Sequence, residues 1–302
     1  MPLVLAFANL GSQGRLGNQL FQIAATAAYA ADLGVRCVML PWEYAPYFAP
    51  SPGGDDCFVA WLAVGAALPL LTAVAEESGF AHRESDPGMR ASLQALAAAA
   101  PSDRTVAVSL KGYFQSELYF APRHERAVRA LFSPHPSVME RLSAKYANVL
   151  ASRPRSCALH VRRGDYIWNH ARHPLQPVSY YADALRALYC GEQQQQQQQQ
   201  QGPEGVVILV FSDDIPWCKR HLAPALPGGV CIEHVEGNAD IVDMFLMSRC
   251  DDHVIANSSF SWWGAWLCER PGKRVVAPLP RWFGPAAPLR TDDILPAGWM
   301  AM

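Results

Sequence analysis

The segment with the clearest chemical character is an apolar run, residues 157–161, that ends in charged side chains. His160, Arg162, Arg163 and Asp165 stand together there. If the run is a strand of a parallel sheet, its carboxyl end is where such sheets bind ligands. A guanidinium suits a pyrophosphate because it donates two parallel hydrogen bonds and keeps its charge. Consecutive strand side chains diverge, so we expect one arginine to face a ligand and the other to pair with an acid such as Asp165. The alternative is a structural ion pair alone.

A second apolar run, residues 206–211, ends in two adjacent carboxylates, Asp213 and Asp214. Adjacent carboxylates on a strand diverge, which argues against a shared metal ion, and we expect no metal site. We expect Asp214 to cap a helix that begins near Pro216. Asp213 is then the ligand residue, because its oxygens can accept hydrogen bonds from a guanine edge.

A third polar group joins an expected strand at 253–256 to an expected helix at 260–269. It consists of the polar residues Asn257, Ser258 and Ser259, followed by Phe260 as a further candidate for the donor site. Hydroxyl and backbone N–H groups at a helix start can hold phosphate oxygens without adding charge. In the helix that follows, Trp262 and Trp266 are expected to be core residues.

Near the start of the chain, Gly11, Gly14 and Gly17 follow an apolar run and precede a helical one. N–H groups at such a helix start can hold an anion, and Asn18 could add a neutral donor. The alternative for Asn18 is a helix cap. The glycine spacing differs from the dinucleotide fingerprint, so a nicotinamide-dependent oxidoreductase, with Glu43 as its ribose-binding acid, rests on an incomplete motif.

These groups need elements to position them, and short apolar runs alternate with helical runs along the chain. Such alternation predicts parallel sheets covered on both faces, an α/β fold. The expected strands are 3–8, 35–40, 105–110, 157–161, 206–211, 230–235, 253–256 and 274–277. The expected helices are 19–33, 122–150, 179–190, 216–221, 239–249 and 260–269. We interpret 41–103 as a variable helical region and the glutamine tract 193–201 as a surface-loop expansion.

Composition narrows the class of protein. The length of 302 residues predicts two domains, with one large domain as the alternative, and a hydrophobic content of 50% excludes general disorder. A net charge of −2 argues against a broad nucleic-acid partner. Eight cysteines without a Cys-x-x-Cys pair give no zinc signal and leave the disulfide state open. We expect neither a signal peptide nor a membrane span.

Taken together, the motifs resemble those of the α-1,2-fucosyltransferases, glycosyltransferase family 11. The matching segments, in family order, are 14–19, 112–117, 160–166, 180–181, 211–218 and 240–267. The resemblance implies a GT-B fold, two Rossmann-like domains facing across a cleft. Residues 1–154 would form the acceptor-side domain and 155–302 the GDP-fucose-binding domain. It further implies inverting transfer of fucose from GDP-β-L-fucose to the 2-hydroxyl of a terminal galactoside, without a metal or other cofactor.

The resemblance also assigns roles to residues. Arg162 would bind the pyrophosphate, His160, Arg163 and Asp165 would complete its motif, and Ser258 and Ser259 would lie in the donor pocket. Asn18 would lie near the reacting centre. Asp165 and Glu117 are candidates for the general base.

Two alternatives remain open at this point. One is a fucosyltransferase of different linkage, and the other is a non-catalytic relative that binds GDP-sugars or carbohydrates. For a eukaryotic member the resemblance implies a Golgi location. The oligomeric state and the acceptor glycan are not predicted, although the region 41–103 is expected to select the acceptor.

Overall fold

The computed structural model describes residues 3–50, 59–61, 70–77, 87–190, 205–287 and 289–302. The chain divides into two compact units, Met1–Pro136 with Leu289–Pro296, and Ser137–Pro288 with Ala297–Met302. The division lies at the first residue of helix α4 (Pro136–Leu150), and the boundary expected from the sequence is near residue 154. The glutamine tract lies outside the described residues.

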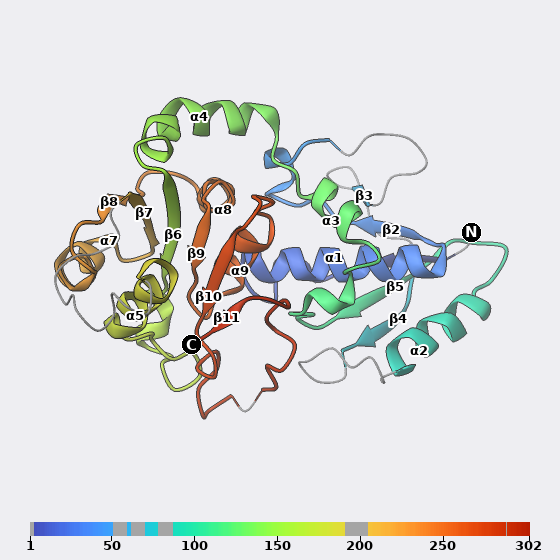
Figure 1. The fold of residues 1–302 in the computed structure, drawn as a ribbon. Helices are drawn as coiled ribbons and strands as arrows, with labels where there is room; N and C mark the ends of the chain where they lie inside the picture. The colour runs from blue at the N-terminus through green and yellow to red at the C-terminus, as the bar shows by residue number, and fades with distance from the viewer. Residues whose placement is uncertain (1–2, 51–58, 62–69, 78–86, 191–204, 288) are drawn as a thin grey trace. The chain divides into compact units, whose positions relative to one another are not determined.

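The first unit contains a five-stranded parallel sheet with the strand order β3-β2-β1-β5-β4 (Figure 1). The strands are β1 (Leu3–Ala6), β2 (Arg36–Met39), β3 (Ala60–Trp61), β4 (Leu70–Glu76) and β5 (Val106–Lys111). The helices are α1 (Leu16–Leu33), α2 (Pro87–Ala98) and α3 (Glu125–Leu131), with 3-10 turns at Ala45–Tyr47 and Glu117–Tyr119.

Helix α1 begins three residues before the expected start and ends where the sequence predicts. Its alanine-rich sequence presents little side-chain volume, and almost every residue from Leu16 to Ala30 is buried. Gly34 ends the helix in the left-handed conformation, with φ 63°, and its N–H bonds the carbonyls of Ala30 and Ala31. The helix therefore leads directly from the glycine loop into the core.

The expectation of a helical region at 41–103 is wrong for residues 70–76. Strand β4 lies there and pairs in parallel with β5, Ala73 opposite Val108. Alanine favours helices, but an apolar run of this length is also compatible with a strand. The segment forms a strand because it pairs with β5 at the edge of the sheet. Helix α2, at 87–98, does fit the expectation.

The second unit contains a six-stranded parallel sheet with the strand order β11-β10-β9-β6-β7-β8 (Figure 1). The strands are β6 (Arg155–Val161), β7 (Val206–Ser212), β8 (Cys231–His234), β9 (Asp252–Val254), β10 (Arg274–Ala277) and β11 (Met300–Ala301). The helices besides α4 are α5 (Val178–Tyr189), α7 (Ile215–Trp217), α8 (Asp240–Met247) and α9 (Ser259–Trp266). Shorter helical turns lie at Gly164–Ile167, Cys218–Leu222 and Ala223–Ala225.

The core of the second unit forms between its sheet and the helices. The predicted core residues Trp262 and Trp266 are buried, with ring planes 9° apart. The inner face of β6 and β7 packs on Tyr181 and Leu185 of α5. All-parallel strands are covered on both faces, which explains why β7 is apolar from Val206 to Phe211 and why β6 is buried from Ser156 to Val161.

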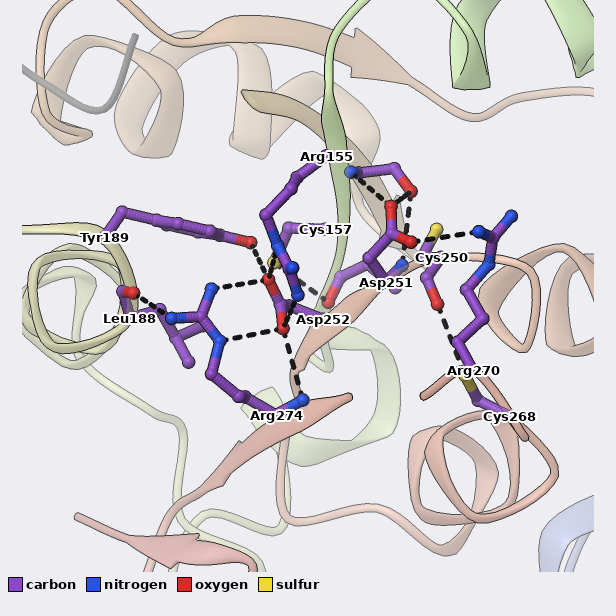
Figure 2. A network of polar contacts seen from close by, with 12 residues as sticks. Arg155, Cys157, Leu188, Tyr189, Cys250, Asp251, Asp252, Cys268, Arg270 and Arg274 are labelled. Carbon is purple, nitrogen blue, oxygen red and sulfur yellow. Dashed lines mark hydrogen bonds and ion pairs between the residues drawn. The ribbon is translucent and has the colours of Figure 1, made fainter. Parts of the chain in front are cut away.

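One buried carboxylate ties three strands together at their amino ends (Figure 2). Asp252 has 0% of its surface exposed and opens β9. It accepts hydrogen bonds from Arg155 at 2.8 and 2.9 Å, from Arg274 at 2.7 Å and from Tyr189 at 2.8 Å. Arg155 and Arg274 are the first residues of β6 and β10, so the cluster lies at the sheet edge opposite the strand ends that carry the predicted ligand residues.

The seven cysteines within the described ranges are thiols. Of the helices in the described part of the chain, none is both long and apolar enough to cross a bilayer.

Candidate functional site

Three neighbouring strands of the second sheet bring the predicted donor-binding groups together. Strand β6 lies between β9 and β7, and His160 pairs in register with Phe211. Because all three strands are parallel, the segments that follow them emerge at the same edge. Residues that are far apart in the sequence therefore meet at the carboxyl end of this sheet, where open α/β sheets bind ligands.

Arg162 lies at the centre of this edge. Its Nη1 is 2.7 Å from Oδ2 of Asp213, and its Nη2 pairs with Asp165. The guanidinium carbon is also 5.4 Å from the ring centre of Tyr166. Only 15% of the Arg162 side chain is exposed, so two carboxylates and an aromatic ring fix the guanidinium before any ligand arrives.

Arg163 is held by different partners. Its Nε is 3.1 Å from Asp214, and its guanidinium lies 3.9 Å above the ring of Trp217. The expectation that only one arginine pairs with an acid is therefore wrong. The sequence could not show that β7 would supply an acid for each, because Asp213 and Asp214 follow a different strand.

The two aspartates use all four carboxylate oxygens. Asp213 Oδ1 accepts from the Arg163 backbone N–H at 2.8 Å, in addition to its contact with Arg162. Asp214 Oδ1 accepts from Trp217 N–H at 3.1 Å, which confirms Asp214 as the cap of α7. Gly164 leaves room for this arrangement, since a Cβ there would lie 2.5 Å from Asp213 Oδ2.

His160 is the next-to-last residue of β6 and stays neutral. It is 4% exposed, and its ring centre is 5.3 Å from that of Phe260 at the start of α9. Burial, aided by the charge of Arg162, lowers the pKa of His160 to about 3. Its Nδ1 has no hydrogen-bond partner among the described residues. Buried polar atoms are normally satisfied, so this nitrogen is suited to a ligand.

At the β9–α9 junction, Asn257 and the serines have separate tasks. The Asn257 amide donates to the carbonyls of Pro174 at 3.1 Å and Trp282 at 3.0 Å, and its own backbone carbonyl accepts from Tyr166. Asn257 thus fixes the loops around the site. Ser258 precedes α9 in extended conformation, and its side chain does not cap the helix. Ser259 is the first residue of α9.

In the first unit, Asn18 lies in the first turn of α1, beside the segments that follow β1 and β5. The helix cap is Arg15, so the cap alternative for Asn18 is wrong. Asn18 Oδ1 instead accepts from Gln115 Nε2 at 2.5 Å. Glu117, the other candidate base, begins the 3-10 turn Glu117–Tyr119 and is half-exposed.

Glu77 is a residue of this edge that the sequence does not indicate. It accepts from the backbone N–H groups of Tyr113 at 2.8 Å and Phe114 at 3.1 Å, and from the Tyr119 hydroxyl at 2.6 Å. Burial raises the pKa of Glu77 above its ordinary value. Phe114 has φ 53°, so the carboxylate holds a strained turn whose next residue, Gln115, bonds Asn18. The position of Glu77 follows only from the presence of strand β4 directly before it.

Among the described residues, no three or more acids, histidines or cysteines lie together in a way that could hold a metal ion. The second unit instead combines fixed guanidinium groups, a neutral histidine and a helix N-terminus at one edge. This combination can bind a diphosphate and stabilise negative charge that develops on it.

Comparison with curated proteins indicates the family. The model of glycosyl transferase family 11 matches residues 105–299. An α-1,2-colitosyltransferase of Escherichia coli is 36% identical over 196 residues, 64% of this chain and 62% of that protein. The O-antigen biosynthesis glycosyltransferase WbnK of Escherichia coli is 40% identical over 143 residues, 46% of this chain and 42% of that protein. The galactoside 2-α-L-fucosyltransferase SEC1 of Bos taurus is 27% identical over 203 residues, 60% of this chain and 52% of that protein. The chain thus spans less than two thirds of each relative.

Solved structures share the fold at low sequence identity. NodZ α-1,6-fucosyltransferase soaked with GDP-fucose has a TM-score of 0.52 and 15% identity, over 88% of this chain and 92% of that chain. POFUT1 in complex with GDP-fucose has a TM-score of 0.56 and 11% identity, over 91% and 96%. The predicted GT-B type fold of two parallel α/β units is confirmed. Since the family model matches more than half of its length, the chain belongs to glycosyl transferase family 11.

Proposed function

We propose that this protein transfers L-fucose from GDP-β-L-fucose to the 2-hydroxyl of a terminal galactoside, with inversion at the sugar carbon. The observation that carries the proposal is the fixed Arg162 guanidinium, at the carboxyl end of β6 beside the unpartnered His160 nitrogen. The second unit would bind the nucleotide sugar and the first unit the acceptor. Two of the relatives are named for 2-linkages, the α-1,2-colitosyltransferase and the galactoside 2-α-L-fucosyltransferase, which supports the choice of hydroxyl.

In this reaction the bond between the fucose C1 and the β-phosphate oxygen breaks, a bond from C1 to the acceptor oxygen forms, and the proton of the acceptor hydroxyl passes to a base such as Glu117 or to solvent. The sugar becomes oxocarbenium-like, while negative charge builds on the departing phosphate. A guanidinium at that phosphate stabilises the transition state more than the ground state. We propose Arg162 for this role, with His160 and the start of α9 as neutral donors.

The donor has to compete with carboxylates for Arg162. Two guanidinium groups face three carboxylates at this edge, which leaves a formal charge of −1. The Asp165 side chain is 53% exposed, and exposed ion pairs contribute about 1 kcal/mol or less. We infer that the pyrophosphate displaces Asp165, while Asp213 continues to orient Arg162. Asp165 then acts as an exchangeable partner, which accounts for its place in the motif without requiring it to be the base.

In the first unit, Asn18 belongs to the proposed reacting centre. Gln115 holds the Asn18 amide by its oxygen, and Glu77 holds the turn that carries Gln115. A fixed amide can orient sugar hydroxyls without adding charge, which suits a reaction whose sugar becomes positive.

The test is transfer from GDP-fucose to lactose and N-acetyllactosamine, with the linkage of the product read by NMR. We expect an α-1,2-linked product and no detectable transfer by Arg162→Ala at unchanged melting temperature. A different linkage would reassign the acceptor hydroxyl, and GDP binding without turnover would favour a non-catalytic relative. Undiminished transfer by Arg162→Ala would remove the role given to that residue.

A second donor is favoured by one observation. The 36% identical relative is named as a colitosyltransferase, and colitose is L-fucose without its 3-hydroxyl. Parallel assays with GDP-fucose and GDP-colitose distinguish the two donors. A higher kcat/KM with GDP-colitose would replace fucose in the proposal and leave the linkage unchanged.

A further inference from the structure

A pocket of about 400 Å³ in the first unit has no part in the donor chemistry described above. Its walls come from the segment after β2, the end of β3 and the residues around the end of α3. The lining includes Trp42, Ala45, Phe48, Trp61, Phe132 and His135. Small-molecule sites have volumes of about 300–1,000 Å³, so the pocket is large enough for a ligand.

Stacked aromatic rings form one wall of the pocket. The Trp42 ring lies 5.5 Å from that of Trp61 with planes 8° apart, and 5.4 Å from that of Phe48 with planes 14° apart. Trp42 and Phe48 are buried, whereas Trp61 is half-buried. The electron-rich face of an aromatic ring attracts the slightly positive C–H groups of a ligand. A pyranose ring presents such C–H groups on its faces and hydroxyls around its rim.

The rest of the lining favours a neutral ligand with polar groups at its edge. Among the described residues, the lining contains no Asp, Glu, Lys or Arg side chain. His135 provides an imidazole that can bond a hydroxyl, and it is half-buried. A charged nucleotide would find no counter-charge here, whereas an uncharged sugar needs none.

The pocket lies at the carboxyl edge of the first sheet. Trp61 is the last residue of β3 and pairs with Met39, the last residue of β2, while Trp42 follows shortly after β2. The glycine loop follows β1 at the same edge, because the strands are parallel. Open α/β sheets bind their ligands at this edge. The position of the pocket and its lining therefore both favour a ligand-binding role.

A buried amide connects the pocket with the glycine loop that precedes Asn18. Trp42 Nε1 donates to Gln19 Oε1 at 2.6 Å, and Gln19 Nε2 donates to the Gly14 carbonyl at 3.3 Å. Gln19 is 4% exposed and directly follows Asn18. The aromatic wall and the glycine loop are therefore fixed relative to each other within the first unit.

We propose that this pocket binds a pyranose ring of the neutral acceptor glycan, with Trp61 as the stacking platform and Gln19 as a positioning residue. The inference rests on the proposed function and adds the residues that select its acceptor. The aromatic wall of the pocket comes from Trp42, Phe48 and Trp61, which belong to the region 41–103 where the sequence predicts acceptor selection.

The test compares Trp61→Ala with Tyr47→Ala, using lactose as the acceptor. Tyr47 lies on the same segment as Trp42, is half-buried, and its ring does not line the pocket. We expect Trp61→Ala to raise the KM for lactose about tenfold, since it removes a stacking face. The KM for GDP-fucose and the slow hydrolysis of GDP-fucose by water are expected to stay unchanged. Tyr47→Ala should match the wild type, and Trp61→Phe should restore most of the lactose affinity.

A second variant fills the pocket and leaves its aromatic rings in place. Ala45 lines the pocket, so Ala45→Phe should weaken lactose binding in saturation-transfer NMR without donor present. If Trp61→Ala does not fold, Ala45→Phe still tests whether the pocket binds lactose. Lactose affinity equal to wild type in the folded variants would overturn the inference. Absence of GDP-fucose hydrolysis and transfer in the wild type would instead refute the proposed function, and the NMR binding result would still decide on the pocket.

Discussion

Arg162 and Asp213 form an ion pair of 2.7 Å that joins the segments following two neighbouring strands of the second sheet. The other Asp213 oxygen accepts from the Arg163 backbone N–H, so one carboxylate fixes both the guanidinium and the chain that carries it. A site that stabilises charge by preorganised groups requires a fixed guanidinium, and this contact fixes the position of Arg162.

Replacing Asp213 by asparagine tests this positioning role. The amide keeps the shape of the side chain but removes its charge and offers only one acceptor oxygen. Since a hydrogen bond to a charged group contributes about 1.5–3 kcal/mol, we expect kcat/KM for GDP-fucose to fall about ten- to a hundredfold. Gly164→Ala should act in the same direction, because its Cβ would displace the Asp213 carboxylate.

The matched control for this change is Asp183→Asn. Asp183 pairs with Arg186 on the surface of the same unit, with about half of each side chain exposed. That substitution should leave both stability and kinetics as in the wild type. If Asp213→Asn and its control gave the same kinetics, Asp213 would have no part in orienting Arg162.

Replacing His160 is expected to affect GDP affinity and the stability of the fold in different directions. The fold does not use the Nδ1 atom of His160, so His160→Phe should remove an unsatisfied buried nitrogen and keep or raise the melting temperature. If His160 Nδ1 bonds the donor, the affinity for GDP should fall about tenfold. Calorimetry of GDP binding, together with thermal unfolding, measures both quantities.

The pH dependence adds a second measurement on the same variant. The folded-state pKa of His160 is about 3, against 6.5 ordinarily, so below pH 6.5 the unfolded chain binds a proton that the folded chain does not. Wild-type stability should fall as the pH falls from 6.5 towards 3, and less so in His160→Phe. His253 is the control: it is also buried, has a pKa of about 4 and an Nδ1 without a partner among the described residues, but it lies near the amino end of β9 and its Nε2 contacts the Met247 carbonyl. His253→Phe should lower stability and leave GDP affinity unchanged.

Much of this site can be predicted from sequence, because apolar runs that end in polar groups mark strand ends. On that ground alone, Arg162, Asp213 and Asn257 are expected at one sheet edge. The pairing between acids and arginines cannot be predicted, since it depends on the register between β6 and β7. Glu77 escapes prediction for a related reason. The strand before it, β4, is an edge strand that pairs with β5 on one side, and its alanine-containing sequence is also compatible with a helix.

Asp252 offers a prediction about stability at the opposite edge of the sheet (Figure 2). Burial alone would raise the pKa of Asp252, but hydrogen bonds from Arg274 and Arg155 outweigh it and lower the pKa to about 2, from 3.8. The difference corresponds to about 2 kcal/mol of stability that is present above pH 3.8 and is lost as the pH falls through 2. Asp252→Asn should therefore lower the free energy of unfolding by about 2–4 kcal/mol at neutral pH.

Chemical denaturation across a pH range of about 2–7 measures this contribution, and GDP affinity at a temperature where the variant is folded provides the contrast. Because Asp252 lies at the amino ends of the strands, GDP affinity should not change. Asp292→Asn, which breaks an exposed pair with Arg290, is the control and should leave stability unchanged. A loss of GDP affinity at unchanged stability would show that the two sheet edges are not independent.

Metal independence is the last prediction, and it follows from how the adjacent carboxylates are used. The oxygens of Asp213 contact Arg162 and the Arg163 N–H, and those of Asp214 contact Arg163 and the Trp217 N–H. A divalent cation at these oxygens would have to displace these four donors and would lie against two guanidinium groups. The positive charge that a metal ion would supply to a departing diphosphate is already present in Arg162. We therefore expect the rate of fucose transfer to be the same in excess EDTA as in manganese or magnesium. A loss of activity in EDTA that manganese restores would contradict this and would require Asp213 to leave Arg162 during the reaction.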